Sequence, residues 1–421
     1  MKKTMTIVAL VLVCVFMLAA CSSGAGTATE EPAADAATET AAADDTVAEQ
    51  PAADDTATEE PAADDSAASG DKMLIGFNNF LKGNYSVDIL ERAVVQTIEA
   101  LGGEAMVVND EAKPENSASN VDNMIAAGVD GIVFLGLADT LFPVVAQKCD
   151  AAGVPFVITD HKPTEDVLET LIASETYVGG ACTEDFNTGR GIADYALEDG
   201  LSKAVVITSE NTDTTHYARA TSFEEQFTAG GGEVLNISWG SIAQLSDVLT
   251  RATDVLTAHP DADCVYATNG DIGSICLEAL AKFPDMDAKL FVTDLDPSVL
   301  EGLKSGDVAA GNGAHWINGN ISTALLINYL QGNHIVDGDG NSPMIIVPVM
   351  VLPSNLVDLY DEFWIQNQPY SNEELQAMVS ADMTYADFEQ IMTDYTVENR
   401  LQAKVDQGLL SQEDLDAALA G

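Results

Sequence analysis

The chain has 421 residues, which leaves room for two or three ordinary domains. Hydrophobic residues make up 47% of it and charged residues 20%, enough for a sizeable core, which excludes a chain that is disordered throughout. The 17 Lys and Arg residues against 68 Asp and Glu give a formal net charge of −51, which argues against binding to nucleic acid or to anionic lipid surfaces.

The first twenty residues have the layout of a secretory signal peptide. Lys2 and Lys3 precede an apolar run over residues 5–20 that is short for a membrane span. The run ends in Leu18-Ala19-Ala20-Cys21, which resembles the lipobox of bacterial lipoproteins. We therefore expect residues 1–20 to be removed, Cys21 to be lipidated, and the protein to lie outside the cytoplasm, held to the cell membrane by that lipid anchor only. An ordinary signal with a chance Cys is the alternative.

Residues 21–71 form an acidic segment of low complexity. Residues 30–71 hold 14 Asp and Glu and no Lys or Arg, with the related stretches EEPAAD, EQPAADD and EEPAADD starting at residues 30, 49 and 59. No large apolar side chain lies between Val47 and Met73, so burial cannot offset chain entropy and the like charges extend the segment. We interpret residues 21–71 as a lipidated, disordered acidic linker, with a calcium-collecting tail as the alternative.

From Lys72 onward, short apolar runs alternate with amphipathic stretches that end at glycines. This alternation predicts parallel sheets with helices on both faces. Strands are predicted at 73–78, 105–108, 131–135 and 155–159, with helices at 86–101, 119–127 and 141–152. The rhythm then restarts, with strands at 170–173, 204–208, 234–237, 264–267 and 290–292 and helices at 179–197, 219–228, 245–258 and 274–282. The sequence thus predicts an α/β protein with two Rossmann-like βα lobes.

Polar and aromatic residues follow many of these strands. In open parallel sheets the ligand crevice lies at the carboxyl ends of the strands. Carboxylates, amides, an Arg and aromatic rings together bind a polyhydroxylated neutral ligand through charge-assisted hydrogen bonds and ring stacking. Each of these residues alone is explained as well by a helix cap or a turn. The candidate ligand-binding residues are Asn79, Phe80, Asn84, Tyr85, Asp160, His161, Arg219, Asn269, Asp294 and His315.

The order of these pieces resembles the type I periplasmic binding proteins of the ribose/galactose-binding class, over about residues 72–360. The stretches that carry the resemblance are residues 151–160 (AAGVPFVITD), 189–195 (GRGIADY), 256–260 (LTAHP), 265–269 (VYATN) and 347–352 (VPVMVL), with Asn355. The resemblance implies two lobes joined by three crossings, hinge closure on a ligand, and delivery of that ligand to an ABC transporter permease. It places the N-terminal lobe at 72–174 and 315–345, and the C-terminal lobe at 175–314 and 346–361.

The resemblance also assigns roles to single residues. Asn84 is similar to the Asn that opens the first helix in the family, and Asp160 to the acceptor of sugar hydroxyls. Arg219 is similar to the Arg of the family's Arg-x-x-Gly-Phe motif. Asn269 and Asp294 resemble the amide and the carboxylate of the second lobe.

The sequence departs from the ribose-binding pattern around these residues. Residues 85–87 read Tyr-Ser-Val in place of Pro-Phe-Phe, His161 stands where Arg is common, and Ser222 replaces the motif Gly. No Gln is evident at the third crossing, where the sequence has Asn312, His315 and Trp316. The pocket therefore differs from a ribose pocket, and the replacement stacking surfaces would be Phe80, Tyr85, Trp239 or Trp316.

Residues 362–421 lie after the region that resembles the family and form an acidic extension. Ser371, Thr384 and Ser411 each precede an acidic residue at the spacing of a helix cap, which predicts three short helices. The extension either packs against a lobe or offers a docking surface.

We expect neither a metal nor a cofactor. The five His residues lack a metal-binding spacing, and residues 337–348 lack the Glu that closes a calcium loop. Cys149, Cys182, Cys264 and Cys276 occur in apolar elements and form no Cys-x-x-Cys pair, although a Cys264–Cys276 disulfide stays open.

The predicted function is that of a solute-binding lipoprotein that captures a sugar or sugar-like molecule, works as a monomer and has no enzymatic activity. No Gly-x-Ser-x-Gly motif is present, and hydroxyl binding accounts for paired carboxylates. The alternatives are a nucleoside, an autoinducer-like compound or an amino acid as ligand, a signalling receptor as partner, or a surface spacer that binds no small molecule.

Overall fold

The computed structural model describes residues 72–136, 138–242 and 244–420. The predicted signal peptide, Cys21 and the 21–71 linker lie outside the described residues. These described residues belong to one compact unit, and the account below concerns that unit. Within the described ranges, no helix combines the length and the apolar character needed to cross a membrane.

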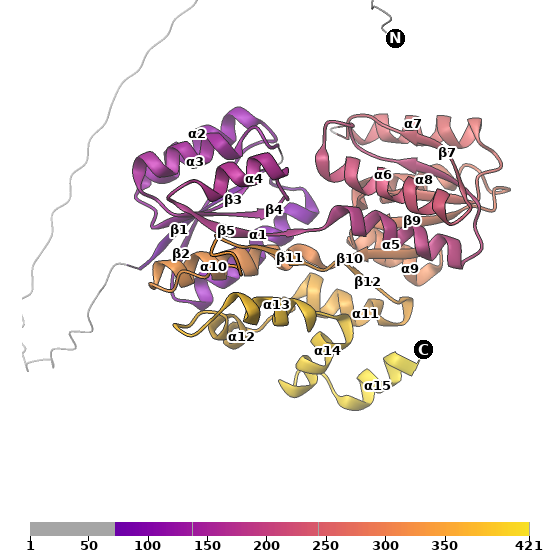
Figure 1. Cartoon of the computed structure of the whole chain (residues 1–421). Coiled ribbons are helices and arrows are strands. Elements are labelled where there is room, and N and C mark those ends of the chain that lie inside the picture. Colours follow the sequence, from indigo (N-terminus) through magenta and orange to yellow (C-terminus); the bar gives the residue numbers. More distant parts are fainter. Residues whose placement is uncertain (1–71, 137, 243, 421) are drawn as a thin grey trace, which may run out of the picture. The chain divides into compact units, whose positions relative to one another are not determined.

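The first lobe contains a six-stranded sheet in the order β11-β5-β4-β3-β1-β2 (Figure 1). Its paired strands are all parallel. Helices α1 and α10 pack with one hydrophobic cluster and helices α2 and α3 with another, so both faces of the sheet are covered. The strands are β1 (Leu74–Asn79), β2 (Glu104–Asn109), β3 (Gly131–Leu135), β4 (Phe156–Asp160), β5 (Tyr177–Thr183) and β11 (Met344–Val347), and the helices are α1 (Tyr85–Ala100), α2 (Pro114–Ala127), α3 (Phe142–Ala152), α4 (Glu165–Ile172) and α10 (Asn318–Leu330).

The second lobe repeats this plan in the order β12-β10-β9-β8-β6-β7. Its pairs are parallel except β10 with β12, which is antiparallel. The two-lobed α/β fold that the sequence predicts is thereby confirmed. The strands are β6 (Lys203–Ile207), β7 (Glu233–Ser238), β8 (Cys264–Ala267), β9 (Lys289–Thr293), β10 (Val308–Gly313) and β12 (Met350–Val351), and the helices are α5 (Asp185–Glu198), α6 (Thr214–Ala229), α7 (Leu245–Ala258), α8 (Gly270–Leu280) and α9 (Pro297–Ser305).

The chain passes between the two sheets three times. The first crossing is at Glu184, between β5 and α5. The second is at Ala314, between β10 and the 3₁₀ helix η1 (His315–Ile317), and the third is at residues 348–349, between β11 and β12. Strand β5 and all of β11 pair within the first sheet. The lobe boundaries at 174/175, 314/315 and 345/346 stay predictions.

The prediction for residues 165–198 is wrong in two elements. Residues 170–173 end helix α4 instead of forming a strand, and the strand is β5, where a helix from residue 179 was predicted. Gly179 and Gly180 hide the strand in the sequence, since glycine has low β propensity. The structure shows why they are needed, because a Cβ on Gly179 would lie 2.6 Å from the carbonyl oxygen of Pro343, next to β11.

Helix α6 begins at Thr214, five residues before its predicted start. Asp213 caps it by accepting a hydrogen bond from the backbone N–H of His216 at 3.2 Å. Arg219 therefore lies inside the helix, about one and a half turns from its beginning, and not at its first position as predicted.

The acidic extension is helical and packs on the lobes. Ser371 and Thr384 form capping boxes, and Ser411 accepts from the backbone N–H of Asp414 at 3.1 Å, so the three predicted helices are confirmed. A further helix, α14, is capped by Thr396. The segments are η2 (Ser354–Leu356), α11 (Val357–Tyr360), the π-helix η3 (Asp361–Gln366), α12 (Asn372–Ala377), α13 (Tyr385–Thr393), α14 (Val397–Asp406) and α15 (Gln412–Ala420).

The four cysteines of the described region are free and buried. Cys264 and Cys276 therefore do not pair in this structure. Burial raises the pKa of the Cys276 thiol to about 12, which keeps it protonated and unreactive.

Candidate ligand-binding site

Asp160 and Asp294 stand at the carboxyl end of the third strand of their respective sheets. Both have a left-handed backbone, with φ of +70° and +72°. Asp tolerates this conformation better than most residues, but it still costs free energy, and such strain is concentrated at functional sites. Asp160 Oδ1 accepts a hydrogen bond from Asn318 Nδ2 at 2.9 Å, and the backbone N–H of Asp294 donates to Asn312 at 2.7 Å.

Arg219 is buried between two carboxylates of the second lobe. Its Nε donates to Asp185 Oδ1 at 2.9 Å, its Nη1 donates to the carbonyl oxygen of Thr268 at 3.0 Å, and Nη1 lies 3.6 Å from Asp294 Oδ1. Burial alone lowers the pKa of Arg219, but the charges of Asp185 and Asp294 outweigh it and raise the pKa above its usual value. Burial raises the pKa of both carboxyl groups, against the attraction of Arg219. One cation thus faces two acidic groups, which leaves the cluster with an excess of acceptors.

Two buried histidines flank this cluster. His315 Nε2 lies 3.7 Å from Asp294 Oδ1, and burial lowers the pKa of His315 to about 4. His216 Nδ1 lies 2.7 Å from Thr268 Oγ1, and burial likewise lowers the pKa of His216. Both rings are neutral at pH 7, so each provides one hydrogen-bond donor and one acceptor.

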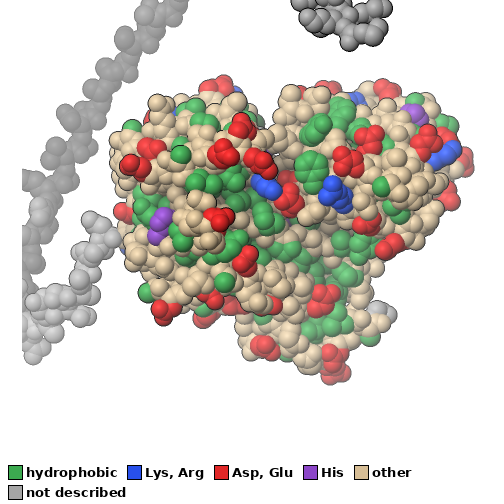
Figure 2. Space-filling model, viewed as in Figure 1, with side chains coloured by type: hydrophobic (Ala, Val, Ile, Leu, Met, Phe, Trp, Pro, Cys, Tyr) green, Lys and Arg blue, Asp and Glu red, His purple; other side chains and the backbone are tan. Residues whose placement is uncertain are grey.

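The two lobes contact each other through two side-chain pairs. Asn84, which caps α1 of the first lobe, donates from Nδ2 to Asp271 Oδ2 of the second lobe at 2.9 Å. His161 Nε2 of the first lobe lies 3.3 Å from Thr214 Oγ1 of the second lobe and 3.2 Å from Asp139 Oδ1. These pairs hold the carboxyl edges of the sheets together. Figure 2 shows a notch between the lobes at the upper edge of the view, and a face with many more acidic than basic side chains.

Several buried polar atoms around this boundary have no hydrogen-bond partner among the described residues. A buried polar group without a partner is costly, so these atoms indicate groups that bind something else. Three of the residues that carry these atoms are neighbours. The ring centroids of His315 and Trp316 lie 5.6 Å apart, and those of Trp316 and Tyr85 lie 6.2 Å apart, with the latter two rings edge to face. The atoms are Tyr85 Oη, Asp294 Oδ1, His315 Nδ1, Trp316 Nε1 and Asn318 Oδ1.

Two of the predicted site residues make side-chain contacts within their own lobe. Asn269 caps α8 by accepting from the backbone N–H of Ile272 at 2.9 Å. The Asn79 amide nitrogen donates within the first lobe to Asp88 and Glu91, at 3.1 and 2.6 Å. Phe80 is half-buried and packs against the hydrophobic core. The other predicted residues belong to the contacts described above, and those are Asn84, Tyr85, Asp160, His161, Arg219, Asp294 and His315.

Sequence reasoning missed two residues of the cluster. Asp185 pairs with Arg219, but the wrong assignment of β5 hid it inside a predicted helix. A strand at residues 177–183 would have placed Asp185 at the carboxyl edge. Asn318 bonds to Asp160 from 158 positions away, which no local pattern shows. Within the described residues, no group of three or more His, Cys, Asp or Glu side chains is arranged to hold a metal ion.

The family model described as "Periplasmic binding protein domain" matches residues 75–334, more than half of the chain. The chain belongs to the periplasmic binding protein domain family. Among curated relatives of this family member, a ribose import binding protein of Bacillus subtilis is 24% identical over 196 residues. That alignment covers 45% of this chain and 60% of the relative. A putative rhizopine-binding protein of Rhizobium meliloti is 27% identical over 176 residues, which cover 41% of this chain and 55% of that relative.

Solved structures of similar fold align with about 70% of this periplasmic binding protein. A Mycobacterium smegmatis protein in complex with β-D-fucofuranose aligns with a TM-score of 0.60 and 17% identity, over 73% of this chain and 97% of its own. An Actinobacillus succinogenes ABC transporter solute-binding protein with bound D-allose aligns with a TM-score of 0.60 and 18% identity, over 69% and 100%. At this identity the alignments establish the fold, which is that of a type I periplasmic binding protein.

Proposed function

We propose that this protein captures a sugar or sugar-like small molecule between its two lobes. The observation that carries the proposal is the set of buried polar atoms without partners beside Asp160 and Asp294. Hydroxyl groups both donate and accept, so a polyol satisfies carboxylate acceptors and donors such as Trp316 Nε1 together. The names of the relatives agree, since ribose import and complexes with furanose and hexose sugars occur among them.

The charges favour a neutral ligand over an amino acid. A ligand carboxylate would enter a region where Asp160, Asp185, Asp271 and Asp294 outnumber Arg219. The guanidinium group is also occupied, because Asp185 and the carbonyl oxygen of Thr268 accept two of its hydrogen bonds. An α-carboxylate would therefore meet repulsion and would have to displace an existing buried ion pair.

Binding in this fold is expected to stabilise the closed arrangement. A ligand that contacts both lobes adds its full set of hydrogen bonds only when the lobes are together, so it shifts the population toward the closed form. Asn84–Asp271 and His161–Thr214 are the protein's own contacts across that boundary. The role assigned to the site is binding without chemistry.

We also propose where the protein is located and to which partner it delivers the ligand. The Leu-Ala-Ala-Cys21 end of the apolar segment supports lipidation at Cys21 and anchoring at the outer side of the cell membrane. We place the folded lobes, as a monomer, at the end of the acidic linker, delivering the ligand to an ABC transporter permease. A curated relative named for ribose import supports this assignment.

A thermal-shift panel on the full chain tests the proposal, with pentoses, hexoses, polyols, nucleosides and amino acids. A ligand at about 100 times its Kd adds about 2.7 kcal/mol to folding free energy, which raises the Tm by roughly a few degrees. We expect shifts with sugars or polyols. A shift with amino acids alone, or with no compound in the panel, would contradict the proposal, and a shift with nucleosides alone would keep the site and change the ligand class.

A further inference from the structure

The segment after the last strand, residues 354–420, is here called the C-terminal brace. On the first lobe, Gln96 Nε2 of α1 donates to the carbonyl oxygen of Tyr370 at 3.0 Å, and Gln376 Nε2 donates to that of Ala100 at 2.7 Å. Asn328 of α10 donates to the carbonyl oxygen of Met378 at 2.8 Å. The middle of the brace is thus fixed to two helices of the first lobe.

The start of the brace contacts the second lobe, and the two ends of the brace contact each other. Helix α11 and the π-helix η3 pack against α9, and Lys304 Nζ of α9 lies 2.8 Å from Asp358 Oδ1 of α11. Near the C-terminus, Ala418 accepts a hydrogen bond at 2.6 Å from Asn355 Nδ2, just after β12. The brace therefore spans from one lobe to the other.

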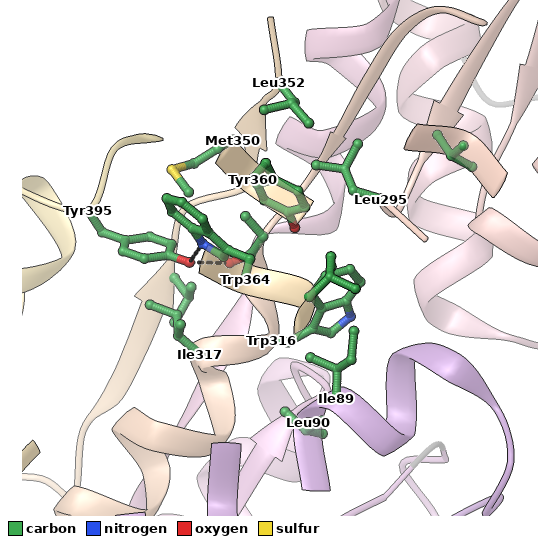
Figure 3. Close-up of a cluster of buried hydrophobic side chains, with 14 of the residues drawn as sticks. Ile89, Leu90, Leu295, Trp316, Ile317, Met350, Leu352, Tyr360, Trp364 and Tyr395 are labelled. Carbon is green, nitrogen blue, oxygen red and sulfur yellow. Dashed lines mark hydrogen bonds between the residues drawn. The ribbon is translucent and has the colours of Figure 1, made fainter. Parts of the chain in front are cut away.

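Between these attachments, aromatic side chains of the brace fill the space behind the crossings. Figure 3 shows Tyr360, Trp364 and Tyr395 of the brace beside Trp316 and Met350, which follow the second and third crossings. The same cluster includes Ile89 and Leu90 of α1 in the first lobe and Leu295 of the second lobe. A single apolar cluster thus joins both lobes to the brace.

One hydroxyl group ties the brace to a crossing. Tyr395 Oη donates to the carbonyl oxygen of Ala314 at 2.5 Å and accepts from Trp364 Nε1 at 3.0 Å. Ala314 is the residue of the second crossing, with a left-handed φ of +67°. The bond therefore fixes the backbone at a point that a rotation of the lobes has to deform.

The position of the brace decides how it responds to such a rotation. In Figure 1 helices α11 to α15 lie below β10, β11 and β12, whereas α2 and α7 lie at the opposite, upper side of the two lobes. A rotation about the crossings that separates α2 from α7 brings the lobes together on the brace side. The brace is packed on that side and would be compressed, and close-packed protein interiors resist compression.

A cavity of about 500 Å³ separates helix α13 of the brace from the crossings. It is lined by Glu184, Pro348 and Val349 of the first and third crossings, and by Met392 and Thr393 of α13. When the lobes open, the crossings and helix α13 can approach each other only by the space that this cavity provides. The volume of the cavity therefore sets how far the lobes can separate.

We propose that the C-terminal brace restrains the hinge. It limits the opening of the lobes and raises the share of closed molecules when no ligand is bound. A protein whose competent state is already populated binds its ligand more tightly, so the brace tunes affinity from outside the ligand site.

Distances between spin labels on the ligand-free full chain test the restraint. Ser119→Cys on α2 and Thr250→Cys on α7 place labels at exposed positions of the two lobes, and the four native cysteines of the described region are buried. Tyr395→Phe removes the bond to Ala314 and also the acceptor of Trp364 Nε1. Loss of the bond to the crossing alone should raise the ratio of open to closed molecules about five-fold, the effect of one lost hydrogen bond. Thr393→Trp fills the cavity and should shift the distances the other way.

Tyr195→Phe, at an exposed position of α5, is the matched control and should leave the distances unchanged. If Tyr395→Phe fails to fold, as judged by circular dichroism, Thr393→Trp decides alone. Wild-type distance distributions in both variants, or one unchanging distance in every variant, would overturn the proposal. These measurements use no ligand, so their outcome is independent of which ligand the site binds.

Discussion

Asp160 and Asp294 occupy matching places in the two lobes, each at the carboxyl end of the third strand and each with a left-handed backbone. The conformation aims two acceptors from separate sheets at the boundary between the lobes. Backbone strain and the proposed ligand contact respond differently to substitution, so variants at these two positions can separate them.

Asp160→Asn is expected to weaken ligand binding without weakening the fold. Asn adopts the left-handed conformation readily, and its Oδ1 can still accept from Asn318. The lost charge removes charge-assisted hydrogen bonds to the ligand, about 1.5–3 kcal/mol, or roughly ten-fold to a hundred-fold in Kd. Calorimetric titration with the sugar found in the panel, together with the Tm, measures both effects. Asp307→Asn, at an exposed position, is the control. Unchanged affinity in Asp160→Asn would remove Asp160 from the site.

Arg219→Met should destabilise the fold by about 3–5 kcal/mol, because it leaves Asp185 and Asp294 buried without their cation. Arg190→Met is the matched control, since its pair with Glu225 is exposed at 3.6 Å and should contribute less than about 1 kcal/mol. Urea unfolding of the three proteins at pH 7 gives the comparison. Equal losses in the two variants would show that the Arg219 cluster has no special stabilising role.

His315 should make the folded state less stable in mild acid. Its pKa is about 4 in the folded protein against 6.5 unfolded, so the unfolded chain binds the proton first as the pH falls. The contribution of His315 to the free energy of unfolding is fully present above pH 6.5 and is lost as the pH falls toward 4. At pH 5 the loss is about 2 kcal/mol.

The comparison with His315→Gln isolates this effect from other titrating groups. His216 acts in the same direction, whereas Asp185 and Asp294, whose pKa values are raised by burial, act in the opposite direction. Urea unfolding at pH 7.5 and pH 5 should show a smaller pH dependence in His315→Gln than in the wild type. An identical dependence in both would assign the acid sensitivity elsewhere.

Cys21→Ala should release the protein from the membrane. Without the thiol no lipid can be attached, and the apolar segment before it is short for a stable span. Detergent phase partitioning of cell fractions measures the change, with the wild-type protein in the detergent phase and the variant in the aqueous phase. Cys182→Ala, at a buried position of β5, serves as the control. Membrane retention of Cys21→Ala would point to an ordinary signal and another means of attachment.

Elements with a strong local pattern were predictable to the residue. The strands Gly131–Leu135 and Cys264–Ala267 and the helix Leu245–Ala258 have the predicted bounds, because apolar periodicity and flanking turns define them locally. Strand β5 was not predictable in this way. Gly179 is required by its contact with Pro343, far along the chain, and Gly180 by its contact with Ile158 of the neighbouring strand, and a local pattern contains neither contact.

The candidate site shows the same division. Arg219 and Asp294 could be predicted from their places after strands and from the family resemblance. Asp185 and Asn318 were missed because tertiary contacts bring them to the cluster. Asn269 has the right type and place for a ligand contact, and its side-chain oxygen caps helix α8, so the same residue type and place are also explained by a helix cap.

The pairing of β11 with β5 also dictates an order of assembly. Strand β5 ends at Thr183, and its partner begins at Met344, roughly 160 residues later. A chain that leaves a translocation pore with its N-terminus first therefore presents β5 with one open edge until strands β6 to β10 of the second lobe have emerged. Until then Cys182 of β5, fully buried in the finished fold, lies at this unfinished sheet edge. Contacts of such long separation slow folding and leave open sheet edges prone to pairing with other chains, so the first sheet, though synthesised first, is completed only after most of the second lobe.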